Sequence, residues 1–215
     1  IVDSLVGSEM CIRDRSKCDM PQKDPKMQCF SVCVYCGSRR GAKPIYAQEA
    51  SALGTGLAER GWRLVYGAGD VGLMGNVARA AQAAGGETFG VIPTHLLQLE
   101  VGKQDLSSFI VTENMHERKK VMFMNCDAVV LMPGGAGSLD EFFEVLTWRQ
   151  LGLHSKPVII LNVAGYWDPL LKLTEHFIAE EFADPSIRDF YTVQTTATDV
   201  LAYLAALRAE NPDQL

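Results

Sequence analysis

Short apolar runs alternate with segments of helical periodicity along almost the whole chain, and this alternation limits its possible folds more than any other feature. The runs expected to form strands cover residues 29–35, 62–66, 88–92, 109–112, 128–132, 158–162 and 191–194. The segments expected to form helices cover residues 43–60, 71–84, 114–125, 138–151, 167–182 and 197–209. Strands that alternate with helices build parallel sheets, and continuous aliphatic strands indicate burial on both faces. The pattern predicts an α/β protein with a Rossmann-like, doubly wound, mostly parallel sheet and helices on both faces.

Length and composition favour one folded unit. The 215 residues are 47% apolar and 21% charged, which is ordinary for a globular domain. Residues 28–215 are expected to form a single Rossmann-like domain. Residues 1–27 show no periodicity and lack the pattern of a signal peptide. They are expected to be a non-native or disordered leader, because Ser4–Arg15 resembles a translated sequencing adapter, and the native start is expected at Met27 or Met20.

Charge and cysteine content narrow the partners. The formal net charge of −6 argues against nucleic acid and against an anionic membrane surface. No apolar stretch approaches the roughly 20 residues that span a bilayer. Cys33-x-x-Cys36 has no second pair of cysteines, and the four histidines have no zinc spacing, so buried thiols and no metal are expected. Together these features predict a cytoplasmic protein that binds a small molecule.

The most informative local motif is the turn Pro133-Gly134-Gly135-Ala136-Gly137-Ser138-Leu139-Asp140-Glu141, which leads from an apolar run into an amphipathic helix. Its glycines let backbone N–H groups approach an anion, and the helix start directs its unpaired N–H groups to the same place. Ser138 adds a hydroxyl donor, and Glu141 lies one turn later on the same helix face. The turn therefore predicts a phosphate site beside a carboxylate. The spacing Ser138-x-x-Glu141 also fits a capping box, an alternative that spacing leaves open.

Two further loops are expected at the same edge of the sheet, because ligands bind outside the carboxyl ends of parallel strands. The first, Cys36–Gly41, contains Ser38. The second, Gly67–Gly75, begins with G-x-G-x-x-G but follows the second strand, with no acid at the tip of the next one. A nicotinamide or flavin site is therefore disfavoured. A loop facing a phosphate or sugar through Gly69 is favoured, with tight strand–helix packing as the alternative.

The segment Asn114–Lys120 opens a helix that places a cation among apolar side chains. Met115, Arg118 and Met122 lie on one stripe at i, i+3 and i+7. A cation near a helix N-terminus is unfavourable unless an anion compensates it, which favours a ligand-binding role for Arg118 over a surface ion pair. Asn114 and Glu117 have the spacing of a capping box, and that structural role is favoured for Glu117.

Taken together, these segments resemble one family. They are Cys36-Gly-Ser38, the run Val65–Gly75, Met115-His-Glu-Arg-Lys119, the turn Pro133–Glu141, the run Thr147–His154, and Lys156-Pro157. From about Cys33 to Leu207 the chain is similar to the cytokinin-activating phosphoribohydrolases of the LOG type, formerly labelled lysine decarboxylases. Three positions depart from the family pattern: Ser138 replaces threonine, Asp140 replaces a common glutamate, and Ala68 replaces a frequent glycine. Ser138 keeps the hydroxyl group and is expected to change affinity modestly without changing the reaction. Ala68 is expected to narrow slightly how closely a ligand can approach the second loop.

The resemblance implies hydrolysis of the N-glycosidic bond of an (N6-substituted) adenosine 5′-monophosphate, with release of the free base and ribose 5-phosphate. It assigns catalysis to Arg118 and Glu141. It assigns substrate binding to Glu100, Lys119, Thr147 and the turn residues, with Glu100 facing the base. Adding the residues expected from the loops, the predicted substrate-binding set is Ser38, Gly69, Glu100, Met115, Lys119, Gly134, Gly135, Ala136, Gly137, Ser138 and Thr147.

In the expected mechanism the carboxylate of Glu141 supports positive charge on the ribose and orients the attacking water, as acids do in glycoside hydrolysis. Arg118 donates hydrogen bonds to the leaving base or fixes ribose and phosphate. This scheme needs no cofactor. The alternatives are a general AMP or purine nucleotide nucleosidase and a non-catalytic protein that binds a nucleotide or phosphorylated cofactor.

A homodimer is also expected. The segments 121–126 and 142–148 carry more apolar side chains than one core face requires, and the resemblance implies the same assembly. Simple core packing is the alternative.

Overall fold

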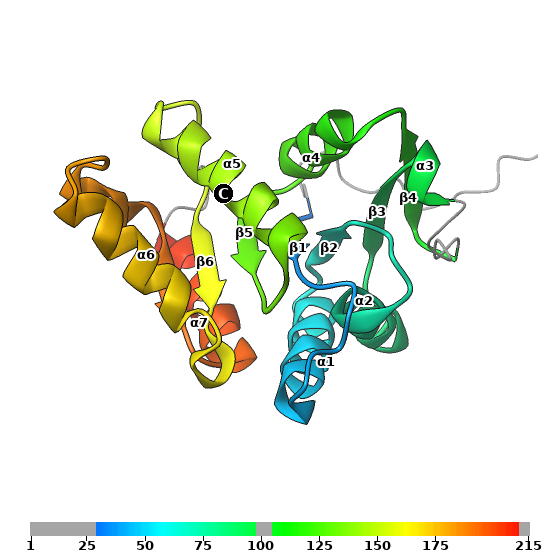
Figure 1. Cartoon of the computed structure of the whole chain (residues 1–215). Helices are drawn as coiled ribbons and strands as arrows, with labels where there is room; N and C mark the ends of the chain where they lie inside the picture. Colours follow the sequence, from blue (N-terminus) through cyan, green and yellow to red (C-terminus); the bar gives the residue numbers. More distant parts are fainter. Residues whose placement is uncertain (1–28, 98–104, 211–215) are drawn as a thin grey trace, which may run out of the picture.

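The computed structural model describes residues 29–97 and 105–210, which contain one sheet of seven parallel strands (Figure 1). The strands are β1 (Ser31–Tyr35), β2 (Arg63–Tyr66), β3 (Thr88–Pro93), β4 (Ser108–Thr112), β5 (Ala128–Leu131), β6 (Val158–Leu161) and β7 (Thr192–Gln194). Their order across the sheet is β4-β3-β2-β1-β5-β6-β7, and every neighbouring pair is parallel. The predicted doubly wound α/β architecture is confirmed.

The helices are α1 (Pro44–Glu59), α2 (Gly72–Ala83), α3 (Thr94–Leu97), α4 (Met115–Met124), α5 (Ala136–Gln150), α6 (Asp168–Ala179) and α7 (Ala197–Glu210), with 3₁₀ segments η1 (Val163–Gly165) and η2 (Pro185–Phe190). Each expected strand and long helix is present. The short α3, η1 and η2 were not expected from the sequence. The predicted leader, residues 1–27, lies outside the described residues.

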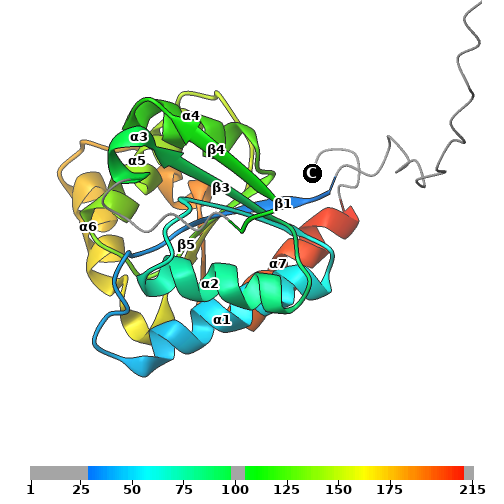
Figure 2. The ribbon, with the colours of Figure 1, turned by 90° about the vertical axis from the view of Figure 1, so that its right-hand side faces the viewer.

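Helices cover both faces of the sheet, and the period of the strands assigns side chains to two cores (Figure 2). In β1, Val32 and Val34 pack with α1, α2 and α7, whereas Cys33 and Tyr35 pack on the other face with α4, α5 and α6. Successive strand residues point to opposite faces, so a central strand needs apolar residues throughout. The uninterrupted apolar run of β1 follows from this position.

The winding reverses beside β1, and this reversal determines where a ligand can bind. The chain leaves β1 toward α1 on one face and leaves the neighbouring β5 toward α5 on the opposite face. A crevice therefore opens between the two connections at the carboxyl ends of the strands, which is the place where doubly wound sheets bind ligands.

No helix within the described residues is long and apolar enough to cross a membrane. The four cysteines in these ranges are free thiols, and Cys33 and Cys36 are buried, as expected from the sequence.

Candidate active site

A cavity of about 510 Å³ opens at the reversal point, and residues from the predicted loops line it. Its wall contains Val34, Cys36, Gly37, Ser38, Arg39, Arg40, Gly41, Tyr46, Gly67, Leu73, Met74, Met115, Arg118, Met122, Pro133, Gly134, Gly135, Ala136, Gly137, Ser138, Glu141 and Tyr166. The size is in the range of small-molecule sites. The loops are fastened to one another, since Gly37 N–H donates to the Pro133 carbonyl at 3.0 Å and Leu73 N–H donates to the Gly37 carbonyl at 3.0 Å.

The glycine turn has the geometry of an anion site. Helix α5 begins at Ala136, and its N-cap Gly135 has no capping side chain, so the first N–H groups of the helix remain for a ligand. A Cβ on Gly135 or Gly137 would meet nothing within 4 Å, whereas a Cβ on Gly134 would lie 2.1 Å from the Ser138 hydroxyl oxygen. Two of the glycines therefore leave space above the amides, and the third makes room for Ser138.

The capping-box alternative for Ser138 and Glu141 is wrong. Helix α5 starts two residues before the predicted boundary, so Ser138 lies inside the helix rather than at its N-cap. No hydrogen bond holds the Glu141 carboxylate within the described ranges, and this side chain lines the cavity. The carboxylate is therefore directed to the ligand space and not to the helix end.

Arg118 is a buried cation whose position the backbone fixes. Its Nε donates to the Val91 carbonyl at 3.1 Å, and its Nη2 donates to the Gly67 carbonyl at 2.9 Å. Only 6% of the residue is exposed. A guanidinium has five N–H donors, so donors remain on Nη1 and Nη2 for a ligand in the cavity. Gly67 is necessary here, because a Cβ at this position would lie 1.9 Å from Nη2.

The expected cap of α4 is confirmed. The Asn114 side chain accepts a hydrogen bond from the Glu117 N–H at 3.0 Å, and the Glu117 carboxylate accepts one from the Glu113 N–H at 3.0 Å. Glu117 thus reaches the residue before the N-cap, one position further than in a standard capping box. The two contacts fix the start of the helix that carries Arg118.

Glu141 lines the same cavity as Arg118, and its environment shifts the pKa of its carboxyl group. The residue is 8% exposed. Burial raises the pKa of Glu141 to about 7, although the nearby charge of Arg118 opposes this shift. The carboxyl group is therefore poised to exchange a proton near neutral pH. The Cys36 thiol beside it stays neutral, because burial raises its pKa.

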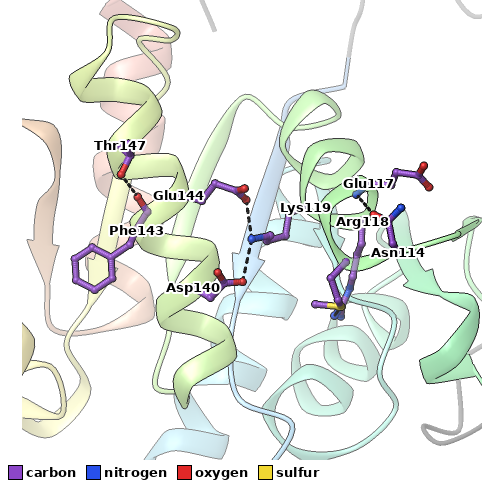
Figure 3. Close-up of polar contacts among 9 residues, drawn as sticks. Asn114, Glu117, Arg118, Lys119, Asp140, Phe143, Glu144 and Thr147 are labelled. Atoms are coloured by element: carbon purple, nitrogen blue, oxygen red, sulfur yellow. Dashed lines mark hydrogen bonds and ion pairs between the residues drawn. The ribbon is translucent and has the colours of Figure 1, made fainter.

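Lys119 reaches from α4 to α5 and is bound there to two carboxylates (Figure 3). Its Nζ lies 3.0 Å from Asp140 Oδ2 and 3.2 Å from Glu144 Oε2. Lys119 is not among the residues that line the cavity. The structure thus places it between two helices, and not beside the predicted phosphate site.

The other predicted binding residues divide into three groups. Ser38, Met115 and the turn residues Gly134–Ser138 line the cavity. Gly69 and Thr147 do not, and the Thr147 hydroxyl donates to the Phe143 carbonyl at 2.7 Å on the exposed side of α5. Glu100 lies outside the described residues. Ala68 is fully buried away from the cavity wall, so its methyl group does not narrow the ligand space as expected.

Several cavity residues were missed in the sequence. Arg39 and Arg40 directly follow the Cys36-Gly-Ser38 motif, and their charge next to a glycine-rich loop was a usable signal. Tyr166, whose hydroxyl donates to the Gly134 carbonyl, and Tyr46, which packs edge-on against it with ring centroids 5.5 Å apart, come from segments without a motif. Only the folded chain brings them to the glycine turn.

Known proteins are similar to this sequence over most of its length. Residues 74–204 match a family described as possible lysine decarboxylases. The cytokinin riboside 5′-monophosphate phosphoribohydrolase LOG of Oryza sativa subsp. japonica is 42% identical over 173 residues, which cover 80% of this chain and 72% of the relative. LOG7 of Arabidopsis thaliana, of the same description, is 39% identical over 188 residues, 87% of each chain. The chain belongs to the LOG family.

Solved structures show that the fold of this LOG-family chain is also used by carrier proteins. A molybdenum cofactor binding protein from Rippkaea orientalis aligns with a TM-score of 0.65 and 23% identity, covering 84% of this chain and 98% of that one. A Moco carrier protein from Chlamydomonas reinhardtii aligns with a TM-score of 0.61 and 21% identity, covering 85% and 99%. At this identity the likeness concerns the fold alone, so function has to be argued from the cavity.

Proposed function

We propose that this LOG-family chain hydrolyses the N-glycosidic bond of N6-substituted adenosine 5′-monophosphates and releases a free base and ribose 5-phosphate. One observation carries the proposal: the Glu141 carboxyl and the Arg118 guanidinium line the same cavity as a glycine turn with open backbone amides. The relatives named above are phosphoribohydrolases of cytokinin riboside 5′-monophosphates, which is the same chemistry.

Cleavage of the C1′–N9 bond develops positive charge on the ribose and negative charge on the base. The ionised Glu141 stabilises the ribose side and accepts a proton from the attacking water, while protonated Glu141 can do neither. Arg118 donates hydrogen bonds to the negative side, and a guanidinium does this without giving up a proton. Because the pKa of Glu141 is raised to about 7, turnover should increase as pH rises through neutrality.

The amides of Gly135–Ser138 bind the 5′-phosphate and thereby position C1′. Binding energy from a distant phosphate can be used to orient the reacting atoms, so a nucleoside without it should react poorly. Arg39 and Arg40, both exposed on the neighbouring loop, add positive charge at the cavity rim.

The chemistry does not fit the decarboxylase description of the family. Amino-acid decarboxylation through a Schiff base requires a lysine in the site. Among the described residues, no lysine lines the cavity. A general AMP nucleosidase would use the same catalytic pair, and the choice between plain and N6-substituted adenine depends on the base pocket.

The test is direct. Purified protein is incubated with AMP, N6-isopentenyladenosine monophosphate and the two matching nucleosides, and the free bases are separated by chromatography. Base release from the monophosphates but not from the nucleosides supports the proposal. Faster release from AMP favours the general nucleosidase, and nucleotide binding without release favours a carrier.

We further propose a cytoplasmic homodimer. Buried free thiols fit a reducing compartment.

Of the apolar side chains expected at an interface, Met122, Phe123 and Phe142 are buried within the subunit, so core packing explains them. Met124, Leu151 and Leu153 are more than 60% exposed at the adjoining ends of α4 and α5 and are the better candidates. Light scattering after chromatography should give twice the subunit mass, and Met124→Lys should lower it.

A further inference from the structure

Lys119 has an unusual environment for a lysine. Its side chain is 6% exposed, although lysines are almost never fully buried without a partner. Both partners come from α5: the side chain of Asp140 is 59% exposed and that of Glu144 is 25% exposed. Burial alone would lower the pKa of Lys119, but hydrogen bonds to the two carboxylates outweigh this effect and raise it. The ammonium therefore remains charged between the two helices.

Two of the three charged groups, Lys119 and Asp140, are next to the proposed catalytic pair in sequence, and Glu144 lies one helical turn after Asp140. Consecutive residues of a helix point roughly 100° apart, so Lys119 and Arg118 leave α4 in different directions, as do Asp140 and Glu141 on α5. Figure 3 shows Lys119 reaching α5 while Arg118 extends in another direction, and of the two only Arg118 lines the cavity. Asp140 and Glu144, at i and i+4, form one face that receives the ammonium.

We propose that Lys119 is a positioning residue and not a substrate ligand: its ammonium, inserted between Asp140 and Glu144, fastens α5 to α4 and keeps the Glu141 carboxyl opposite the Arg118 guanidinium. The inference deepens the proposed function, because the carboxyl that it places is the one assigned to catalysis. The family resemblance led to the opposite expectation, that Lys119 contacts the nucleotide.

The same cluster acts on the charge of Glu141. The groups that face this carboxyl are Arg118 and Lys119 from α4, Asp140 and Glu144 from α5, and Cys33, Tyr35 and Cys36 from β1 and its end. Apart from burial, the positive charges of Arg118 and Lys119 favour ionised Glu141, and the negative charges of Asp140 and Glu144 disfavour it. Loss of Lys119 and loss of Asp140 should therefore move the titration of Glu141 in opposite directions.

The decisive measurement is the titration of Glu141, followed by NMR on protein labelled with ¹³C at the glutamate carboxyl carbons and assigned with Glu141→Gln. Lys119→Met should move the midpoint upward by about one pH unit, and Asp140→Asn should move it downward. Lys119→Arg, which keeps the positive charge, should leave the Glu141 midpoint at its wild-type value. Arg188→Met, which removes the same charge from an exposed ion pair with Glu175, serves as the control and should change nothing.

Calorimetry separates a positioning lysine from a phosphate ligand. For Lys119→Met, AMP affinity should be little changed, while turnover should fall about 10- to 100-fold because the carboxyl is misplaced and less ionised. If Lys119 instead bound the phosphate, Lys119→Met should raise the Kd of AMP about tenfold and leave the Kd of adenosine unchanged.

Two results would overturn the inference. One is a Glu141 midpoint that stays the same or falls in Lys119→Met. The other is a selective loss of AMP affinity in that variant. If Lys119→Met fails to fold, the other two variants still test the inference. Asp140→Asn must lower the Glu141 midpoint, and Lys119→Arg must leave it at the wild-type value. Failure of the proposed function would look different: the wild-type chain would release no base, while the titrations would still report on the cluster.

Discussion

At the scale of single residues, the cavity contains a carboxyl group placed where its charge is unfavourable. Glu141 is 8% exposed, and burial raises its pKa to about 7 from an ordinary value of 4.5. The folded protein therefore binds this proton more tightly than the unfolded chain does. Stability is highest below the unfolded pKa and is lost as pH rises toward the folded value.

Glu141→Gln should therefore stabilise the protein in a pH-dependent way. Ionisation of the buried carboxyl costs about 3 kcal/mol above pH 7, and glutamine does not ionise. Urea unfolding at pH 5 and pH 8 would measure this. The free energy of unfolding of the variant, relative to that of wild type, should be higher at pH 8 than at pH 5. The same difference at both pH values would show that Glu141 titrates normally.

Gly67 has a role that involves only its missing side chain. A Cβ there would overlap the Arg118 guanidinium, so this end of the side chain would have to shift away from the Gly67 and Val91 carbonyls. Gly67→Ala is expected to lower the melting temperature modestly and to lower kcat by about 100-fold, because the displaced guanidinium loses its buried hydrogen bonds and its position in the cavity. A fully active Gly67→Ala would mean that the position of Arg118 does not matter for catalysis.

At the scale of secondary structure, helices α4 and α5 carry the proposed catalytic groups, and a lysine outside both of them fixes the end of α4. Lys156 Nζ donates to the carbonyls of Phe123 at 2.7 Å and Cys126 at 2.6 Å and lies 4.3 Å from the Phe123 ring centroid. A cation at a helix C-terminus satisfies carbonyls that have no partner within the helix.

Lys156→Met should lower the free energy of unfolding by about 1 to 3 kcal/mol, because two carbonyls lose a charged donor. Urea denaturation would measure the loss. Lys172→Met, a change of the same kind on the exposed surface of α6, is the matched control and should have almost no effect. If the two variants were equally stable, the cap would contribute nothing.

The elements themselves could be predicted because their signals are local. The apolar run of β5 and the glycines before α5 give strand, turn and helix in order, although the helix starts at Ala136 and not at the predicted 138. Ser138 has the spacing of a capping residue and suggested the later start. The actual N-cap is Gly135, which has no side chain that could mark a helix start in the sequence. The contacts of Lys119 could not be predicted, because they depend on which face of α5 is turned toward α4.

At the scale of the whole molecule, a negatively charged protein has a positively charged cavity. The formal net charge is −6, yet three arginines and one carboxyl group provide the charged side chains that line the cavity in the described ranges. Such a local field attracts an anion that the rest of the surface repels, and salt screens the attraction. The sequence showed the overall charge and placed the loop of Arg39 and Arg40 at the ligand edge of the sheet, while the fold shows that both arginines line the cavity together with the glycine turn.

The double substitution Arg39→Gln and Arg40→Gln is expected to raise the KM for AMP about tenfold and to weaken its dependence on salt. Turnover of any bound nucleotide should change little, because neither residue contacts the reacting atoms in this scheme. Steady-state kinetics at low and high ionic strength would show it. Arg188→Gln is the control for net charge alone, and an equal effect from that remote position would argue against a local rim.

The central claim is that Glu141 acts in catalysis on a nucleotide that the glycine turn binds. The most direct test measures AMP affinity by calorimetry and base release by chromatography on the same preparation of Glu141→Gln. The account predicts near-normal affinity with base release reduced by about 1,000-fold or more. Near-normal base release, or loss of binding together with loss of activity, would contradict it.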